Sequence, residues 1–362
     1  MSNQTISTNL LPSKHHFSTL DGLRGIAAMA IVVFHFMEIA YSDFTKNFMA
    51  HGFLAVDFFF CLSGFVMAYA YDDRLKGMGL LEFLKARIIR LHPLVVLGGV
   101  LGLLGYLFDP FGVEPGIKHA GKILALFFTS IFLIPYPVME ERFFNLFGLN
   151  APSWSLFWEY VANIVYALVL VKIKRNVVLL LWLLAAGWLA YVAQHAGSLL
   201  GGWNGDNFWE GAARISYSFL AGMLIFRFNL IIRSGLGFAG MTVLLLAAFL
   251  VPFTWGWAAE LAIVLLYFPL LIALGAGTTT SPALKKLCGF SADISYPLYM
   301  THYPVMWMFL HYFSTYKPDM PTVTIIIILG LVLLVIFAFL VMRFYDIPLR
   351  RYLNQKFRKQ HA

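Results

Sequence analysis

An arginine and a histidine stand in one apolar run, at a spacing that suits anion binding and proton transfer. Arg24 and His35 are eleven residues apart within residues 20–41. In an α-helix, eleven residues make three turns plus about 20°, so both side chains share a face and lie about 16 Å apart along the axis. A guanidinium binds phosphate or carboxylate, and an imidazole takes a proton from a hydroxyl group. The pair therefore predicts a track with an anion site at one end and a general base at the other.

Two carboxylates are expected at the depth of this histidine. Asp57 lies about five residues inside the run 52–71, and Glu159 lies in the run 153–171. A carboxylate beside an imidazole fixes its tautomer and raises its basicity. We therefore predict His35, Asp57 and Glu159 as the catalytic group. Within the membrane, any one of these charges taken alone could equally be a polar clamp between helices.

Further candidates for binding recur at helical spacings. Arg87 and Arg90 are three residues apart, share one helix face, and with Arg24 form an expected anion-binding group. Ordinary positive charges flanking a span are the alternative for the two later arginines. The expected substrate-binding residues, which cluster in two segments, are Trp154, Ser155, Ser295, Tyr296, Tyr299 and His302.

The elements that position these residues must be membrane helices. Of 362 residues, 60% are hydrophobic and 12% are charged, about half the roughly 25% charged share of soluble domains. This composition excludes a disordered chain and a water-exposed globule. Eleven apolar runs come near the roughly 20 residues that a helix needs to cross the hydrocarbon, and they are 20–41, 52–71, 91–108, 120–136, 153–171, 177–193, 212–227, 236–253, 257–276, 291–313 and 322–344. The sequence predicts an all-α polytopic membrane protein in a lipid bilayer.

Loop charges reduce the eleven runs to ten crossings. Lys and Arg cluster at 72–90, 172–176, 227–233, 285–286 and 343–359, and cytoplasmic loops collect such residues. Eleven crossings would put 72–90 and 172–176 on opposite sides. The run 120–136 ends in a Pro-Tyr-Pro sequence and suits a re-entrant or interfacial segment. We therefore predict about ten transmembrane helices with both termini cytoplasmic. The net charge of +8 is then a topological signal, and no nucleic-acid partner is expected.

One domain accounts for the chain. We expect a cytoplasmic N-terminal tail at 1–19, a membrane domain at 20–344 and a basic cytoplasmic tail at 345–362. The N-terminal segment does not resemble a cleavable signal peptide. Cys61 and Cys288 stand far apart without a CxxC motif, so neither a disulfide framework nor a metal site is expected.

Together these motifs resemble the acyltransferase family 3 membrane proteins. The matching segments, in chain order, are 20–25 with His35, 52–58 with 62–65, 87–90 with Pro93, 154–156 with Glu159, and 295–299 with His302. The sequence departs from the family at 345–348, where Tyr-Asp-Ile-Pro stands in place of an expected Glu before the proline. Some members add an extracytoplasmic esterase-like domain at the C-terminus, and we expect none in the short segment after 344. An extracytoplasmic partner protein is one way to supply a later step.

The resemblance implies transfer of an acyl group, usually acetyl from cytoplasmic acetyl-CoA, to a hydroxyl of a cell-surface or extracellular carbohydrate. It also implies a place in the bacterial cytoplasmic membrane. Acetyl-CoA would be the donor substrate, held by Arg24, Arg87 and Arg90. His35 would activate the acceptor hydroxyl, or carry the acyl group itself. An oxyanion would be stabilised by Tyr296, Tyr299 or a backbone N–H.

A transporter or flippase for a glycan or a lipid-linked sugar is the rival interpretation. Buried charges and many aromatic side chains fit it equally well. A transporter would work without acyl-CoA, and its loss would stop the export of unmodified glycan. Loss of the acyltransferase would instead remove acetyl groups from surface glycan.

Overall fold

The computed structural model describes residues 16–112 and 119–359. Within these ranges the chain is helical, and its only β-contacts are two isolated bridges, Asn145 with Asn204 and Ser234 with Thr278. Seven helical stretches of the described chain are long and apolar enough to cross a membrane. The predicted class, an all-α polytopic membrane protein, is confirmed. The count of ten crossings and the cytoplasmic termini stay predictions.

The described chain is built from helices joined by turns and loops of different lengths. The α-helices of the described residues are α1 (Ser18–Ala40), α2 (Ala55–Tyr71), α3 (Leu75–Met78), α4 (Leu80–Leu107), α5 (Ala120–Ile131), α6 (Ser153–Val165), α7 (Arg175–Ala196), α8 (Phe208–Arg227), α9 (Gly237–Phe249), α10 (Gly256–Ala262), α11 (Phe268–Gly277), α12 (Pro282–Thr301), α13 (Tyr303–Tyr316), α14 (Met320–Val341) and α15 (Ile347–Lys359). Three π-helical segments continue α6, join α10 to α11 and join α14 to α15, and they are Tyr166–Leu170, Ile263–Tyr267 and Met342–Asp346. The 3₁₀ turns are Phe44–Lys46, Gly52–Leu54, Glu140–Arg142 and Phe253–Trp255.

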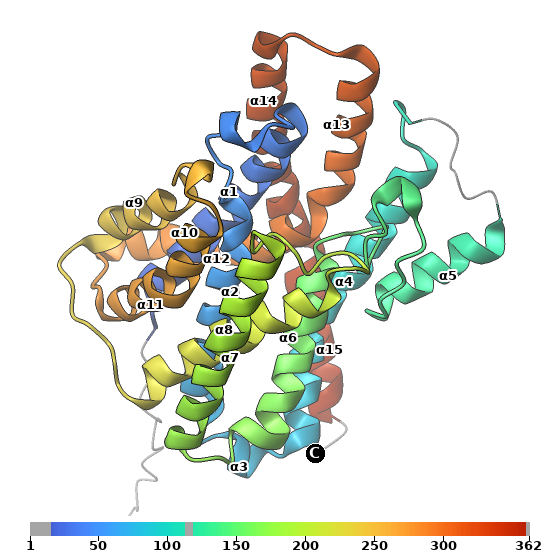
Figure 1. The fold of residues 1–362 in the computed structure, drawn as a ribbon. Helices are drawn as coiled ribbons and strands as arrows, with labels where there is room; N and C mark the ends of the chain where they lie inside the picture. The colour runs from blue at the N-terminus through green and yellow to red at the C-terminus, as the bar shows by residue number, and fades with distance from the viewer. Residues whose placement is uncertain (1–15, 113–118, 360–362) are drawn as a thin grey trace, which may run out of the picture.

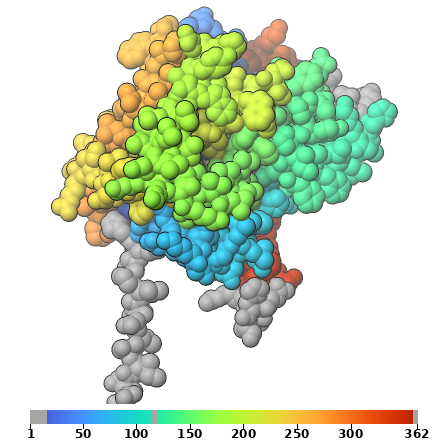
Figure 2. Space-filling model, turned by 60° about the horizontal axis from the view of Figure 1, so that its bottom comes forward, coloured from blue at the N-terminus to red at the C-terminus, as the bar shows by residue number. Residues whose placement is uncertain are grey.

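The bundle has two ends, which we call lower and upper as drawn in Figure 1. The lower end carries α3 and the last turns of α15, and the upper end carries the turn between α13 and α14. Seen from below, the segment around α3 and the neighbouring α15 lie at the lower face (Figure 2). The basic segment 72–90 is at this lower end, which is therefore the end predicted to face the cytoplasm.

Helices α2 and α8 pack with their backbones in contact. A Cβ atom on Gly64 would lie 1.9 Å from the backbone oxygen of Phe219, and one on Gly222 would lie 1.9 Å from that of Cys61. Neither place has room for a side chain, so Gly64 and Gly222 allow the close approach of α2 and α8. Asp57 precedes Gly64 by seven residues and shares its face of α2, which turns this carboxylate toward α8.

Helix α5 does not cross the bilayer by itself. Its 12 residues span about 18 Å, against a hydrocarbon thickness of about 30 Å. It lies out on the flank of α4 (Figure 1), and Leu124 and Phe128 are exposed on it. The prediction that segment 120–136 is not a crossing agrees with this geometry.

The run 291–313, expected as one helix, is broken at His302 into α12 and α13. Pro304 has no N–H to donate to the carbonyl of Met300, four residues earlier, and its ring crowds that carbonyl. The amide Nδ2 of Asn150 donates to the Met300 oxygen instead, at 3.0 Å. The break therefore leaves the carbonyl of Met300 with a hydrogen-bond partner inside the membrane. The helix also continues from α14 into α15 through the expected boundary at 344.

Substituting Gly64 with alanine should destabilise the protein, because the new methyl group meets the backbone of α8. Overpacking of this kind costs about 1–3 kcal/mol, so we expect a clear fall in the thermal unfolding midpoint of the detergent-solubilised protein. Gly187 of α7 is the matched control, since no atom lies within 4 Å of a Cβ built there. Gly187→Ala should leave the midpoint unchanged or raise it. Equal effects of both substitutions would contradict the backbone contact.

Candidate active site

Two cavities lie one above the other beside α1. The upper chamber, of about 380 Å³, is lined by His35, Glu38, Trp154, Tyr303 and Trp307 among others. The lower chamber, of about 560 Å³, is lined by Arg24, Arg87, Arg90, Glu159 and Arg350 among others. Both volumes suit small-molecule sites, which measure roughly 300–1,000 Å³. Val56 and Tyr299 line both chambers, so the two meet at this level.

His35 is held by a carboxylate on its own helix. Its Nδ1 lies 2.5 Å from Oε1 of Glu38, one turn further along α1. An ionised carboxylate only accepts hydrogen bonds, so Nδ1 is the protonated nitrogen and Nε2 keeps its lone pair. The arrangement leaves Nε2 as a base in the upper chamber.

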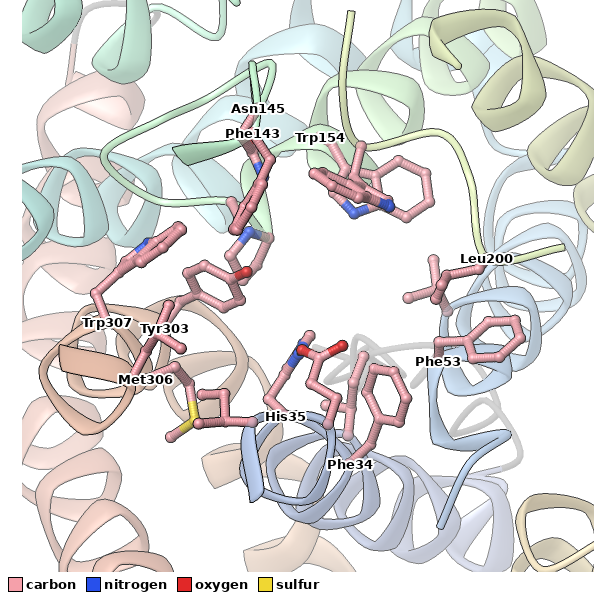
Figure 3. A pocket seen from close by; sticks show the side chains of 18 of the residues that line it. Phe34, His35, Phe53, Phe143, Asn145, Trp154, Leu200, Tyr303, Met306 and Trp307 are labelled. Carbon is pink, nitrogen blue, oxygen red and sulfur yellow. The ribbon is translucent and has the colours of Figure 1, made fainter. Parts of the chain in front are cut away.

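Aromatic side chains form the walls around this base. The rings of Phe34, Phe53, Trp154, Tyr303 and Trp307 surround the cavity in Figure 3. Tyr303 meets the ring of His35 edge-on, with centroids 5.1 Å apart. Its hydroxyl points into the cavity (Figure 3) and makes no hydrogen bond within the described residues. Such walls suit the faces of sugar rings, and the free hydroxyl is a hydrogen-bond donor beside the base.

His302 supports His35 from behind and does not reach the chamber. Its ring stacks on His35 with centroids 5.3 Å apart and an interplanar angle of 24°. The residue is fully buried, and its Nδ1 lies 3.1 Å from the carbonyl oxygen of Leu298. The predicted substrate contact of His302 is therefore wrong, because the break between α12 and α13 turns its ring toward α1.

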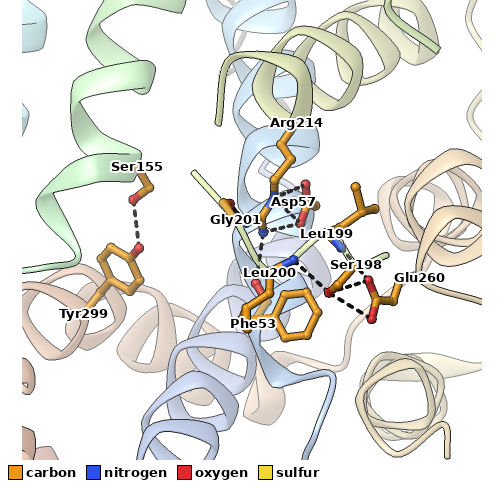
Figure 4. Close-up of polar contacts among 10 residues, drawn as sticks. All are labelled: Phe53, Asp57, Ser155, Ser198, Leu199, Leu200, Gly201, Arg214, Glu260 and Tyr299. Carbon is orange, nitrogen blue, oxygen red and sulfur yellow. Dashed lines mark hydrogen bonds and ion pairs between the residues drawn. The ribbon is translucent and has the colours of Figure 1, made fainter. Parts of the chain in front are cut away.

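The expected contact between Asp57 and His35 is also wrong. Arg214 of α8 binds the carboxylate of Asp57, with its Nη2 2.6 Å from Oδ2 and its Nε 3.2 Å from both oxygens. The same guanidinium donates to the carbonyl oxygens of Gly201 and Phe53 (Figure 4). Asp57 and Arg214 are 0% and 1% exposed. The depth of Asp57 in the membrane suggested His35 as its partner. Asp57 lies on the same face of α2 as Gly64, however, and this face packs against α8.

Glu159 lies lower than expected, in the lower chamber. It accepts from Ser63 at 2.6 Å and from Nη2 of Arg87 at 3.2 Å. The predicted run 153–171 begins at Ser153, which is the first residue of α6. In the structure this residue is buried, and Trp154, the next along α6, already lines the upper chamber. Glu159 is one and a half turns further down, and its predicted place beside His35 is wrong.

The arginines of the lower chamber differ in what they bind. Arg24 donates to the hydroxyl of Ser295 at 3.0 Å and to the carbonyl of Ala292 at 2.8 Å, so it also ties α1 to α12. Arg87 pairs with Glu159. Arg90 is exposed to the chamber and makes no hydrogen bond in the part of the chain that the structure describes. It is therefore the cation most available to an anionic ligand.

The hydroxyls of the two predicted oxyanion tyrosines are both engaged. Tyr296 donates to the carbonyl of Leu91 at 2.6 Å. Tyr299 and Ser155 share a hydrogen bond of 2.8 Å at the level where the chambers meet (Figure 4). Tyr303, one residue beyond His302, has the free hydroxyl instead. The expected oxyanion role therefore fits Tyr303 better than either predicted tyrosine.

Among the residues of these chambers without a role predicted from the sequence are Glu38, Arg142, Tyr303 and Arg350. The sequence could have identified Glu38, because it follows His35 by three residues and so lies on the same helix face. Tyr303 could not be identified in this way, because its direction depends on the break at His302. Among residues 16–112 and 119–359, no group of three or more His, Cys, Asp or Glu side chains is placed to hold a metal ion.

The ion pair between Asp57 and Arg214 should stabilise the folded protein. Breaking a buried ion pair by removing one partner costs about 3–5 kcal/mol, because the other charge stays buried without compensation. Asp57→Asn should therefore lower the unfolding midpoint strongly, and the double variant D57N/R214Q should recover part of the loss. Additive losses in the double variant would show that the two side chains do not depend on each other.

Comparison with known proteins agrees with this geometry. The acyltransferase domain family Acyl_transf_3 matches residues 17–343. Protein 2 in picA locus of Rhizobium radiobacter is 38% identical over 162 residues, which cover 42% of this chain and 81% of that protein. O-acetyltransferase OatA of Staphylococcus aureus is 23% identical over 370 residues, and acyltransferase MdmB of Streptomyces mycarofaciens is 28% identical over 181 residues.

The extent of these matches differs. The OatA alignment covers 94% of this chain and 58% of OatA, so the chain spans little more than half of that relative. The MdmB alignment covers 48% of this chain and 44% of MdmB. No solved structure matches the chain. Because the family match extends over nearly the whole membrane domain, the chain belongs to the acyltransferase family 3.

Proposed function

We propose that this membrane acyltransferase moves an acyl group, most often acetyl, from cytoplasmic acyl-CoA to a hydroxyl of an extracytoplasmic carbohydrate. One observation carries the proposal: a chamber rich in arginine and a chamber with a free imidazole nitrogen meet at Val56 and Tyr299. The bacterial cytoplasmic membrane is the proposed location, with the lower end inside. Membership of an acyltransferase family favours this function over the transport of unmodified glycan.

The lower chamber would receive the donor. Coenzyme A carries several phosphate charges, and arginine binds phosphate with two parallel hydrogen bonds. Arg90 is the unengaged cation there, and Arg24 and Arg87 stand close enough in the same wall to add positive charge. Arg24 and His35 are separated by about 16 Å along α1, a distance that the thin pantetheine arm can span. The thioester would then reach the level of Tyr299.

The upper chamber would receive the acceptor. Its aromatic walls match the apolar faces of sugar rings, and its lining includes Phe143 from the loop before α6 and Leu200 and Trp203 from the loop before α8. A hydroxyl placed at Nε2 of His35 would stand between the base and the entry from the lower chamber. This gives acceptor and donor separate entrances.

The reaction then follows from the groups present. The acceptor oxygen attacks the thioester carbonyl carbon while Nε2 of His35 takes the hydroxyl proton. Tyr303 donates a hydrogen bond to the developing oxyanion. The C–S bond breaks, the imidazolium returns the proton to the coenzyme A thiolate, and the products are the acyl ester and the free thiol. The same free nitrogen can attack the thioester first, which would form an acyl-His35 intermediate.

His35→Ala should abolish labelling of the acceptor glycan in membranes supplied with labelled acetyl-CoA. Loss of general-base help alone costs about 10²–10⁴ in rate. Glu38→Gln should lower kcat by about tenfold to a hundredfold and leave the donor KM unchanged, because Glu38 orients the base and does not touch the donor. Glu82→Gln, an exposed carboxylate on α4, is the matched control. Unchanged labelling in His35→Ala would overturn the proposed chemistry.

Arg90→Gln should raise the donor KM by about tenfold, which is the effect of losing one charge-assisted hydrogen bond to phosphate. We expect kcat to change little, since Arg90 lies far from the base. Arg233→Gln, which removes an exposed cation outside the chambers, is the control for nonspecific attraction of the donor. An unchanged KM in Arg90→Gln would show that Arg90 serves only as a topological charge.

A further inference from the structure

A buried arginine faces the upper chamber without a carboxylate partner. Arg142 ends the 3₁₀ turn Glu140–Arg142 in the loop that leads from α5 to α6, is 4% exposed and lines the chamber. Its guanidinium lies between two rings, 4.9 Å from the centroid of Tyr106 and 4.8 Å from that of Trp307. No Asp or Glu of the described residues lies within ion-pair distance of it. Burial lowers the pKa of Arg142 to about 10, so it stays charged at neutral pH.

A purely structural role explains only one of the hydrogen-bond donors of Arg142. Nη1 donates to the carbonyl oxygen of Gly148 at 2.6 Å, which ties the loop together. The other N–H groups of a guanidinium form a fork that matches a carboxylate or a phosphate. On Arg142, Nε and Nη2 make no hydrogen bond to any described residue, and neither is sealed away from the chamber. A buried charge left this way costs free energy unless a ligand completes it.

Arg142 and His35 lie close enough for one carbohydrate chain to contact both side chains. His35 contacts Tyr303, Tyr303 contacts Trp307 at 6.0 Å between centroids, and Trp307 contacts the guanidinium. Two aromatic rings therefore separate the base from the cation. Beside the base, the carboxylate of Glu38 repels a second negative charge. An anionic group would be directed to Arg142 and a neutral hydroxyl to His35.

From these contacts we infer that the acceptor is an acidic carbohydrate, whose carboxylate or phosphate binds Arg142 while a nearby hydroxyl reaches His35. The inference rests on the proposed function, because it takes the upper chamber as the acceptor site. It adds the chemical class of the acceptor and names Arg142 as the residue that selects it. Trp307 would pack on the same sugar residue, next to the guanidinium that it already contacts.

Direct binding to the detergent-solubilised protein tests this inference without any acyl transfer. Three probes are compared: a uronate tetrasaccharide, the same tetrasaccharide with every carboxyl group reduced, and the neutral chain phosphorylated on its terminal residue. Binding is followed by intrinsic tryptophan fluorescence, since Trp154, Trp203 and Trp307 line the chamber. We expect at least one acidic probe to bind about tenfold or more tightly than the neutral chain. The acidic probe that binds more tightly identifies the carboxylate or the phosphate as the recognised group.

Variants of Arg142 distinguish recognition of an anionic ligand from a purely structural role of this side chain. Arg142→Gln should remove the preference for the acidic probe and leave the affinity for the neutral chain unchanged. A pure clamp would instead lower the affinity for all probes together with the unfolding midpoint. Arg142→Lys, which keeps the charge, should retain part of the preference. Lys46→Gln, an exposed cation in the loop after α1, is the control for general attraction.

Three results would overturn the inference: equal affinity of the wild-type protein for acidic and neutral chains, no binding of any probe, or a preference that survives in Arg142→Gln. The comparison of probes on the wild-type protein needs no variant, so a variant that does not fold leaves the test intact. The labelling assay with His35→Ala decides the proposed function separately. Acyl transfer to a neutral acceptor with equal binding of all probes would retain that function and reject the acidic acceptor.

Discussion

A charge inside a bilayer must find its partner within the protein, and the pair of Asp57 and Arg214 meets this constraint at the centre of the bundle. Its guanidinium joins α2 and α8 and also holds the carbonyl of Gly201 at 2.8 Å. The neighbouring residues of that loop are fixed by Glu260, which accepts the N–H of Leu199 (Figure 4). The loop in turn supplies Leu200 and Trp203 to the upper chamber. The shape of the proposed acceptor site therefore depends on an ion pair that does not touch it.

Since most buried charges are consumed in such pairs, the few groups left without a protein partner stand out. Arg90 in the lower chamber and Arg142 in the upper chamber are cations with no carboxylate within ion-pair distance among residues 16–112 and 119–359. Within the described part of the chain, Nε2 of His35 and the hydroxyl of Tyr303 make no hydrogen bond, and both residues line the upper chamber, which meets the lower one at Val56 and Tyr299. Each of these groups suits one part of acyl transfer from a thioester to a sugar: donor phosphate, acceptor anion, hydroxyl proton and oxyanion.

The sequence predicted the class of fold and the separation of Arg24 and His35 into two levels along α1, because these depend on helix rise and on the apolar runs alone. It did not predict which neighbour a side chain faces. Asp57 reached the expected part of α2 but turned to α8, since the bare backbone at Gly64 sets that helix contact. Glu159 lay too low because α6 begins inside the protein. The break at His302 depends on Asn150, which is 150 residues away from Met300 in the chain, and a local pattern cannot show such a contact.

The central claim is that donor and acceptor enter from opposite ends and meet between the chambers. Proteoliposomes with the protein in a single orientation test it most directly, with labelled acetyl-CoA supplied on one side and the acceptor glycan on the other. The account predicts labelled glycan only when the donor faces the lower end, which carries α3, and the glycan faces the upper end. Labelling that requires both substrates on the same side would contradict it.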